Sequence, residues 1–427
     1  MTGSTFIRML LAIAVVAATG VAKTHAQQPK NAQQKSAQQK GPPAAQPLRS
    51  GFNMPPAGET RFLPAEMLLD IPANVPTLTL DAIAARHAMT RLETQTFGLT
   101  GRTLHRWRLD GGGTVQAMIR GLAGEPLVAG AQPNYIYVLA QDPVAPVNND
   151  QYAPAKLRLI EAHRLATGNR VLVALIDTGV DAAHPDLAGA VAANFDATAD
   201  GAGPGQHGTG MAGAIAAHRA LLGTAPRVGL LTVSAFGSKS SNTDGTTFSI
   251  VKGLDWAAEQ GARVVNMSFA GPADPRLRDA LVKVSRRGIV LIAAAGNAGP
   301  RSPPLYPAAD PNVIAVTATD VEDALFAGAN RGSHIAVAAP GVDVLVPGTR
   351  GTYQLTTGTS VAAAQVSGVV ALLIERNPSL APADVRRILT RTAKAIAPKG
   401  RERDFGAGLV NAYLAVSSAG AASAKPK

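Results

Sequence analysis

The sequence contains no cysteine, and only 4% of its 427 residues are aromatic. The lack of cysteine excludes disulfide frameworks, thiolate nucleophiles and cysteine-ligated metal sites. The scarcity of aromatic residues gives little support to a surface on which nucleic acid bases stack. A hydrophobic content of 46% nevertheless excludes a mostly disordered chain, and the length allows two or three domains with a large buried core.

The formal net charge of +11 lies mainly at the two ends of the chain. Residues 1–49 carry a net charge of +6 and residues 417–427 carry +2, whereas residues 50–149 carry −1 and residues 150–416 carry +4. The folded part is therefore only mildly basic. We expect no nucleic acid partner, because a protein that tracks phosphates needs a concentrated basic face.

Long hydrophobic runs are also missing. The longest, residues 9–18, follows Arg8 and is too short for a comfortable membrane span. Residues 24–26 form an acceptable small-x-small cleavage site, so residues 1–26 are predicted to be a signal peptide, with an uncleaved membrane anchor as the alternative. We expect an exported protein, extracellular or periplasmic, with no stable membrane span once the signal is removed.

The next part of the chain divides into a linker and a small folded unit. Residues 27–52 are rich in Gln, Pro and Lys and cannot bury a core, so they are predicted to be a flexible linker. Residues 53–145 show both strand and helix patterns and are predicted to form a small α+β unit. Its expected strands cover 62–71, 104–109 and 131–139, and its expected helices cover 80–94 and 114–122.

From residue 170 onward, short apolar runs of the type found in buried strands alternate with helical patterns. The expected strands cover 171–176, 229–235, 262–269, 288–295, 313–317 and 335–339, and the expected helices cover 208–219, 246–260, 274–287, 359–375 and 381–395. This alternation predicts an α/β fold, a parallel β-sheet with helices on both faces. We assign residues 146–416 to this domain and residues 417–427 to a flexible tail.

Four polar residues stand where strands of this sheet end or helices begin, which is where sites form in parallel sheets. Asp177 directly follows a strand and Asn297 lies in a turn after another, and both positions would also suit a turn cap. His207 lies among glycines at a helix start, where a lone histidine is more often structural. Ser360 begins an apolar helix, as an N-cap serine does, but there its own N–H and the helix dipole would also face a developing oxyanion.

The order Asp, His, Asn, Ser adds weight to these four residues, since it is the order of the subtilisins and not that of chymotrypsin or the α/β-hydrolases. Over residues 150–415 the chain resembles the subtilisin-like serine proteases. The motifs that carry the resemblance are LIDTGVDAAHPDL at 175–187, HGTGMAG at 207–213, VVNMSFAGP at 264–272, AAAGNAG at 293–299 and GTSVAAAQVSG at 358–368. The resemblance implies a catalytic triad of Asp177, His207 and Ser360, with Asn297 in the oxyanion hole.

The resemblance also implies a serine endopeptidase that is made as a self-processed zymogen. Residues 53–145 are similar to the propeptide of such enzymes through the QPNY stretch at 132–135. In the family this unit assists folding and blocks the active site until it is cut away, so we expect the chain to carry its own intramolecular inhibitor.

The implied chemistry needs polypeptide substrates but no cofactor. Substrate main chain is expected to bind as an added strand. Its expected neighbours are Ser268, Phe269, Ala270 and Gly271 on one side and Phe236 and Gly237 on the other. Structural calcium is common in the family, but no loop with recognisable ligand spacing places it in this sequence. We expect a monomer.

The sequence departs from the family pattern around the site. The departures are Val361, Ala364 and Gln365 after the serine, Gly210 after the histidine and Ala270 in the substrate strand. None of them removes a catalytic group, but together they leave the shape of the substrate groove open.

Two other function classes fit the same fold less well. A catalytically inactive binding protein would show a substituted triad, whereas all four positions are intact. A nucleotide-binding α/β enzyme would need a phosphate-binding motif; the glycine-rich stretch at 201–205 lacks the required spacing, and no Gly-x4-Gly-Lys-[Ser/Thr] occurs.

Overall fold

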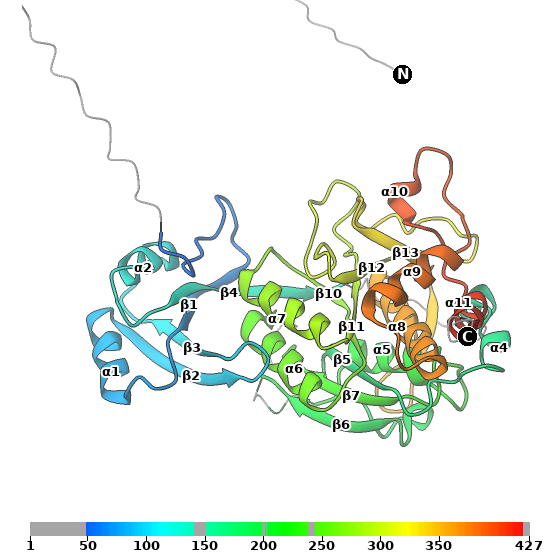
Figure 1. Ribbon diagram of the computed structural model, residues 1–427, viewed down its shortest axis with the longest axis horizontal. Coiled ribbons are helices and arrows are strands. Elements are labelled where there is room, and N and C mark those ends of the chain that lie inside the picture. Colours follow the sequence, from blue (N-terminus) through cyan, green and yellow to red (C-terminus); the bar gives the residue numbers. More distant parts are fainter. Residues whose placement is uncertain (1–47, 141–150, 199–200, 202, 238–243, 422–427) are drawn as a thin grey trace, which may run out of the picture. The chain divides into compact units, whose positions relative to one another are not determined.

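The computed structural model describes residues 48–140, 151–198, 201, 203–237 and 244–421 (Figure 1). The predicted signal peptide, most of the predicted linker and the last six residues lie outside the described residues. So do residues 141–150, which connect the two folded parts of the sequence.

The first folded part is an antiparallel sheet covered on one face by two helices. The sheet order is β4-β1-β3-β2. Its elements are β1 (Phe62–Asp70), α1 (Thr77–Arg86), β2 (Met89–Phe97), β3 (Arg102–Leu109), α2 (Val115–Leu122) and β4 (Gly130–Leu139). Trp107, Ile83 and Ile119 are buried in a core between the sheet and both helices, so this part has a hydrophobic core of its own.

The predicted helix over 80–94 is wrong beyond residue 86. Helix α1 ends at Arg86, Ala88 adopts a left-handed backbone with φ of 48°, and strand β2 begins at Met89. Threonines recur along this segment, and their branched side chains favour a strand. Pairing with β3 therefore prevails over the helical spacing of the apolar residues.

The predicted linker is also too long at its end. Phe52 is buried and bridges Ala131 of β4, and the guanidinium of Arg49 donates to the carbonyl oxygen of Glu125 over 2.8 Å. Residues 48–52 therefore belong to the first folded part, because a large aromatic side chain there completes its core.

The second folded part is a seven-stranded sheet in which every neighbouring pair is parallel. The order is β13-β12-β11-β9-β5-β7-β6. Its strands are β5 (Leu172–Asp177), β6 (Val191–Asp196), β7 (Gly229–Ser234), β9 (Val264–Met267), β11 (Val290–Ala294), β12 (Val313–Thr319) and β13 (Ile335–Pro340). The predicted α/β fold is confirmed; β6, which is only partly buried, is a strand that the apolar runs did not indicate.

Helices cover both faces of this sheet, as alternate residues of β5 show. Val173 and Leu175 belong to the core cluster that includes α5, α8, α9 and α11, whereas Ala174 and Ile176 belong to the cluster that includes α6 and α7. The longer helices are α5 (Gln206–Ala216), α6 (Thr247–Glu259), α7 (Pro275–Arg286), α8 (Thr359–Arg376), α9 (Pro382–Thr392) and α11 (Ala412–Ala421). The shorter elements are α3 (Ala153–Leu157), α4 (Leu159–Ala162), a 3-10 turn (Pro185–Leu187), α10 (Glu402–Phe405) and the hairpin β14 (Val344–Pro347) and β15 (Tyr353–Thr356).

Helices α11 and α8 concern the predicted flexible tail and the expected lack of a membrane span. Helix α11 continues to Ala421 with Val416 and Ala419 buried, so the tail predicted from residue 417 is part of the fold up to that point. Among the described helices, only α8 is long and apolar enough to cross a membrane, and 89% of it is buried inside the domain. Its apolar character is that of a core helix.

Strand β4 joins the two folded parts through hydrogen-bonded pairing. It lies between β1 of its own sheet and the short strand β10 (Phe269–Ala270), and it also pairs with β8 (Gly245–Thr246). This pairing brings the end of β4 to the carboxyl edge of the parallel sheet, where the candidate residues lie.

Candidate active site

Asp177 and His207 are in direct contact. Asp177 is the last residue of β5, its side chain is fully buried, and its Oδ1 accepts a hydrogen bond from Thr178 N over 2.7 Å. His207 Nδ1 lies 2.7 Å from the same oxygen. Because a carboxylate can only accept, Nδ1 carries a proton, and in a neutral imidazole Nε2 would then be free to accept another.

The glycines around His207 allow helix α5 to lie against the end of β5. His207 is the second residue of α5, and Gly208 N donates to Thr178 Oγ1 over 2.9 Å. A Cβ at Gly208 would lie 2.5 Å from the main-chain oxygen of Thr178. The glycine-rich helix start therefore sets how close the imidazole comes to the carboxylate.

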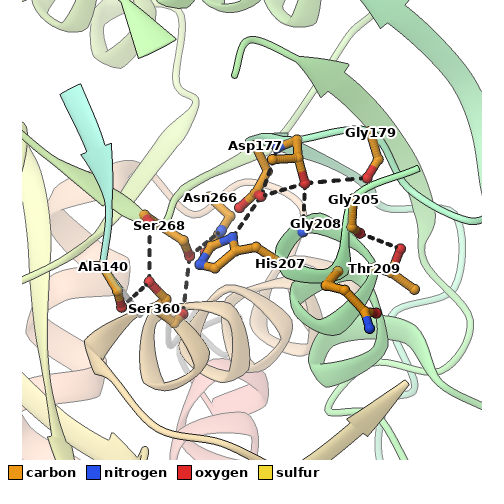
Figure 2. Close-up of polar contacts among 12 residues, drawn as sticks. Ala140, Asp177, Gly179, Gly205, His207, Gly208, Thr209, Asn266, Ser268 and Ser360 are labelled. Atoms are coloured by element: carbon orange, nitrogen blue, oxygen red, sulfur yellow. Dashed lines mark hydrogen bonds and ion pairs between the residues drawn. The ribbon is translucent and has the colours of Figure 1, made fainter. Parts of the chain in front are cut away.

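Ser360 stands in the first turn of α8, on the side of the imidazole away from Asp177 (Figure 2). Its Oγ lies 2.5 Å from the main-chain oxygen of Ala140 and 3.1 Å from that of Ser268, and it donates to these carbonyls. Within the described residues, His207 Nε2 is buried and has no hydrogen-bond partner. The hydroxyl and the imidazole nitrogen are thus neighbours that are not hydrogen-bonded to each other in this state.

Asn297 is held by the residue that precedes Ser360. Its Oδ1 accepts hydrogen bonds from Thr359 N (3.1 Å) and Thr359 Oγ1 (2.8 Å), which fixes the orientation of the amide. Its Nδ2 is buried and has no partner among the described residues. An unpaired buried donor is costly, so this amide group still has hydrogen bonds to give.

Two segments, the end of β4 and residues 268–270, make a small antiparallel arrangement in front of Ser360. Strand β10 pairs with the end of β4, Phe269 opposite Leu139 and Ala270 opposite Val138. Ala140 N then donates to Ser268 O over 3.2 Å. Residues 138–140 therefore lie as an added strand along Ser268, Phe269 and Ala270, which is the arrangement expected for a substrate.

The other predicted neighbours of this strand contact it in other ways or not at all. Gly271 bridges Tyr306, but it also lies against the ring of Tyr137 in β4, which a Cβ at Gly271 would meet. On the far side of β4, the pairing strand is β8, whereas Phe236 bridges Gly245 of β8 and does not itself pair with β4. The prediction for Phe236 and Gly237 was wrong because β8 comes between them and the added strand.

The subtilase family model matches residues 168–408. The chain belongs to the subtilase family. Thermitase from Thermoactinomyces vulgaris is 36% identical over 62% of this chain and 95% of its own length. Subtilisin Savinase from Lederbergia lenta is 37% identical over 59% of this chain and 93% of its own length. The chain is accordingly a subtilisin-like serine endopeptidase.

The structural match to a solved subtilase extends beyond the parallel sheet. Fervidolysin from Fervidobacterium pennivorans, a keratinolytic enzyme related to subtilisin, superposes with a TM-score of 0.72 at 26% identity. The match covers 87% of this chain and 65% of the fervidolysin chain. Because residues 146–427 make up only two thirds of the sequence, part of the first folded part is included in the match.

The sequence motifs of this subtilase did not indicate several residues that lie at the site. Thr359 lies within the serine motif, but its role in orienting Asn297 follows only from the contact. Ala140 carries no chemical signal in the sequence at all. Asp274 precedes a proline at a helix start, which is a recognisable N-cap signal, but nothing in the sequence relates it to β4.

Among the described residues, no group of three or more His, Asp or Glu side chains is arranged to hold a metal ion.

Proposed function

We propose that Asp177, His207 and Ser360 form the catalytic triad of a self-processing endopeptidase, with Asn297 Nδ2 and Ser360 N as the oxyanion hole. The observation that carries the proposal is the Ala140 carbonyl beside Ser360 Oγ. A peptide carbonyl thus lies against the proposed nucleophile while the proposed base and oxyanion donor have buried, unpaired atoms facing the site.

The reaction is acyl transfer. Ser360 Oγ attacks the carbonyl carbon while His207 Nε2 accepts the hydroxyl proton, and the same proton then passes to the leaving amine. Asp177 holds the imidazole with Nδ1 protonated and stabilises the imidazolium. The negative oxygen of the tetrahedral intermediate accepts from Ser360 N and Asn297 Nδ2. Water repeats the sequence on the acyl-enzyme and releases the acid.

The first folded part is proposed as propeptide and inhibitor, with its own chain as the first substrate. The contacts with Ser268 and Ser360 make Ala140 the residue whose carbonyl is attacked, so the bond to be cut is Ala140–Gln141. This site lies five residues before the end of the unit assigned from the sequence. A cleaved strand that stays paired with β10 and β8 would block the site.

Polar contacts away from the site support tight retention of the propeptide. The carboxylate of Asp255 on α6 accepts hydrogen bonds from Gly98 N (3.0 Å) and Leu99 N (2.6 Å) at the β2–β3 turn. Lys252 Nζ on the same helix lies 2.7 Å from Glu93 Oε1. These contacts hold the propeptide sheet on α6 independently of β4.

We further propose that the enzyme is exported, extracellular or periplasmic, and acts as a monomer on polypeptides without a cofactor. Export is supported by the apolar run at residues 9–18 behind Arg8. The absence of a cofactor follows from the mechanism, in which protein groups supply nucleophile, base and oxyanion donors.

An active-site label tests the proposed function. A phosphonate reagent should modify the mature protein at Ser360 and abolish hydrolysis of casein in the same proportion, because only an activated serine attacks the phosphorus. Peptide mapping by mass spectrometry identifies the site. Labelling elsewhere, or casein hydrolysis that survives complete labelling, would contradict the triad.

The end of the propeptide is a second prediction. The fragment released during maturation should end at Ala140, as determined by mass spectrometry of freshly processed protein. Ala140→Pro should slow the first cut strongly, because proline lacks the N–H that donates to Ser268 O. Ala140→Ser keeps that N–H and a small side chain, and should mature normally. A first fragment ending at another residue would refute this cleavage site.

A further inference from the structure

Tyr137, three residues before Ala140, is a fully buried aromatic side chain of the strand held at Ser360. It has no exposed surface, whereas the next residue, Val138, is 52% exposed. Strand β8 pairs at Tyr137 on one side of β4, and β10 pairs at Val138 on the other. The side chain of Tyr137 therefore enters the enzyme and that of Val138 points away from it.

The pocket that receives Tyr137 fits a flat aromatic ring. Phe269 meets the ring edge-on, with centroids 5.8 Å apart and planes at 78°. A Cβ at Gly271 would collide with the ring, so the lack of a side chain there opens the space. Both residues lie within the family match and stay with the enzyme after processing.

The far end of this pocket is a carboxylate. Tyr137 Oη donates to Asp274 Oδ2 over 3.2 Å and lies 3.4 Å from Pro272 O. Asp274 is only 5% exposed. Burial, followed by the nearby Asp274 carboxylate, raises the pKa of Tyr137 well above its ordinary value, so the hydroxyl remains a donor.

Part of the hydrogen bonding of Asp274 leaves with the propeptide. Thr247 Oγ1 and the backbone N–H groups of Arg276 and Leu277, all enzyme groups, donate to the carboxylate over 2.6, 2.8 and 3.2 Å. The other two donors, Tyr137 Oη and Gln132 Nε2, belong to the propeptide. The mature enzyme thus keeps three of the five donors to this carboxylate and loses two, which leaves an acceptor with spare capacity at the base of the aromatic pocket.

We infer that the mature enzyme selects substrates with tyrosine three residues before the residue whose carbonyl is attacked, and that Asp274 is the specificity-determining residue. This inference rests on the proposed function. Phenylalanine fills the same space but leaves the carboxylate short of a donor, and a site built to bond a hydroxyl rejects an analogue that lacks it. Aliphatic side chains lose the edge-on contact with Phe269 as well.

Two matched peptides test the inference on the mature wild-type enzyme. Tyr-Val-Leu-Ala and Phe-Val-Leu-Ala, each followed by the same chromogenic amine, should differ by about tenfold or more in kcat/KM, because the lost hydrogen bond involves a charged acceptor. Tyr-Ser-Leu-Ala should have the same kcat/KM as Tyr-Val-Leu-Ala, since the side chain at the second position, that of Val138 in the propeptide, points to solvent. A Tyr/Phe ratio near one, with both peptides cleaved, would overturn this inference and leave the proposed function intact. Failure to cleave either peptide or casein would instead contradict the proposed function.

Substitution of Asp274 tests whether this carboxylate causes the preference for tyrosine over phenylalanine. Asp274→Ser keeps a side chain that caps α7 but cannot reach the hydroxyl, so the Tyr/Phe ratio should fall toward one. Asp279→Ser removes a carboxylate from the same helix and should keep the wild-type ratio. A purely structural effect of Asp274→Ser would lower kcat/KM for both peptides equally. An unchanged Tyr/Phe ratio in this variant would overturn the role of Asp274.

Discussion

Ser360→Ala should yield an intact precursor with no peptidase activity. The hydroxyl is the proposed nucleophile, and in subtilisin loss of the nucleophile alone costs about 10⁶ in kcat, a size carried over from that relative. The fold should survive, because alanine suits a buried helix and the lost bonds go to two main-chain carbonyls. Electrophoresis and mass measurement of the purified variant, with no other protease added, give the result.

Ser367→Ala is the matched control for this experiment. Ser367 lies two turns further along α8, is equally buried, and donates to Asn266 Oδ1 and to Ala363 O over 3.0 Å each. The variant therefore loses hydrogen bonds of the same kind from the same helix, yet it should still process itself. Normal maturation of Ser360→Ala would sink the assignment of Ser360 as nucleophile.

The parallel sheet and the four polar residues could be predicted because both depend on local sequence. Strands buried on both faces are continuous apolar runs, as in β5 and β11, and Asp177 directly ends one of these runs. Strand β6 was missed because it is only partly buried and has no such run. The helix predicted over 80–94 failed because the pairing of β2 with β3 is a tertiary contact.

The occupied site could not be predicted, because it depends on contacts between distant segments. Ala140 meets Ser360 across 220 residues, and Tyr137 meets Asp274 across 137. Neither Ala140 nor Tyr137 belongs to a motif, so only the folded chain relates them to the site. The sequence identified the candidate catalytic groups, and the fold shows which segment of the chain lies against them.

Asp177→Ala should lower the plateau of kcat/KM by about 10⁴, the order found when the same residue type is removed from the triad of subtilisin. Without the carboxylate, His207 Nδ1 loses its acceptor and the imidazolium loses its counter-charge. The wild-type profile should rise from acidic to neutral pH, because a general base must be unprotonated to act, and then stay level. A wild-type maximum below pH 5 would point to carboxyl chemistry and contradict the triad.

Asp177→Asn separates the loss of the negative charge from the loss of the hydrogen-bond acceptor for His207 Nδ1. The oxygen that faces His207 also accepts from Thr178 N, so an asparagine should place its carbonyl oxygen there and keep Nδ1 protonated. The variant then loses charge but not orientation, and its plateau should lie between wild type and Asp177→Ala. Asp186→Asn alters another fully buried carboxylate, held by backbone N–H groups away from the site, and should leave the plateau unchanged in the folded enzyme. If Asp177→Asn were as slow as Asp177→Ala, the amide would have turned its NH₂ toward His207, and Thr178 N would not control the orientation.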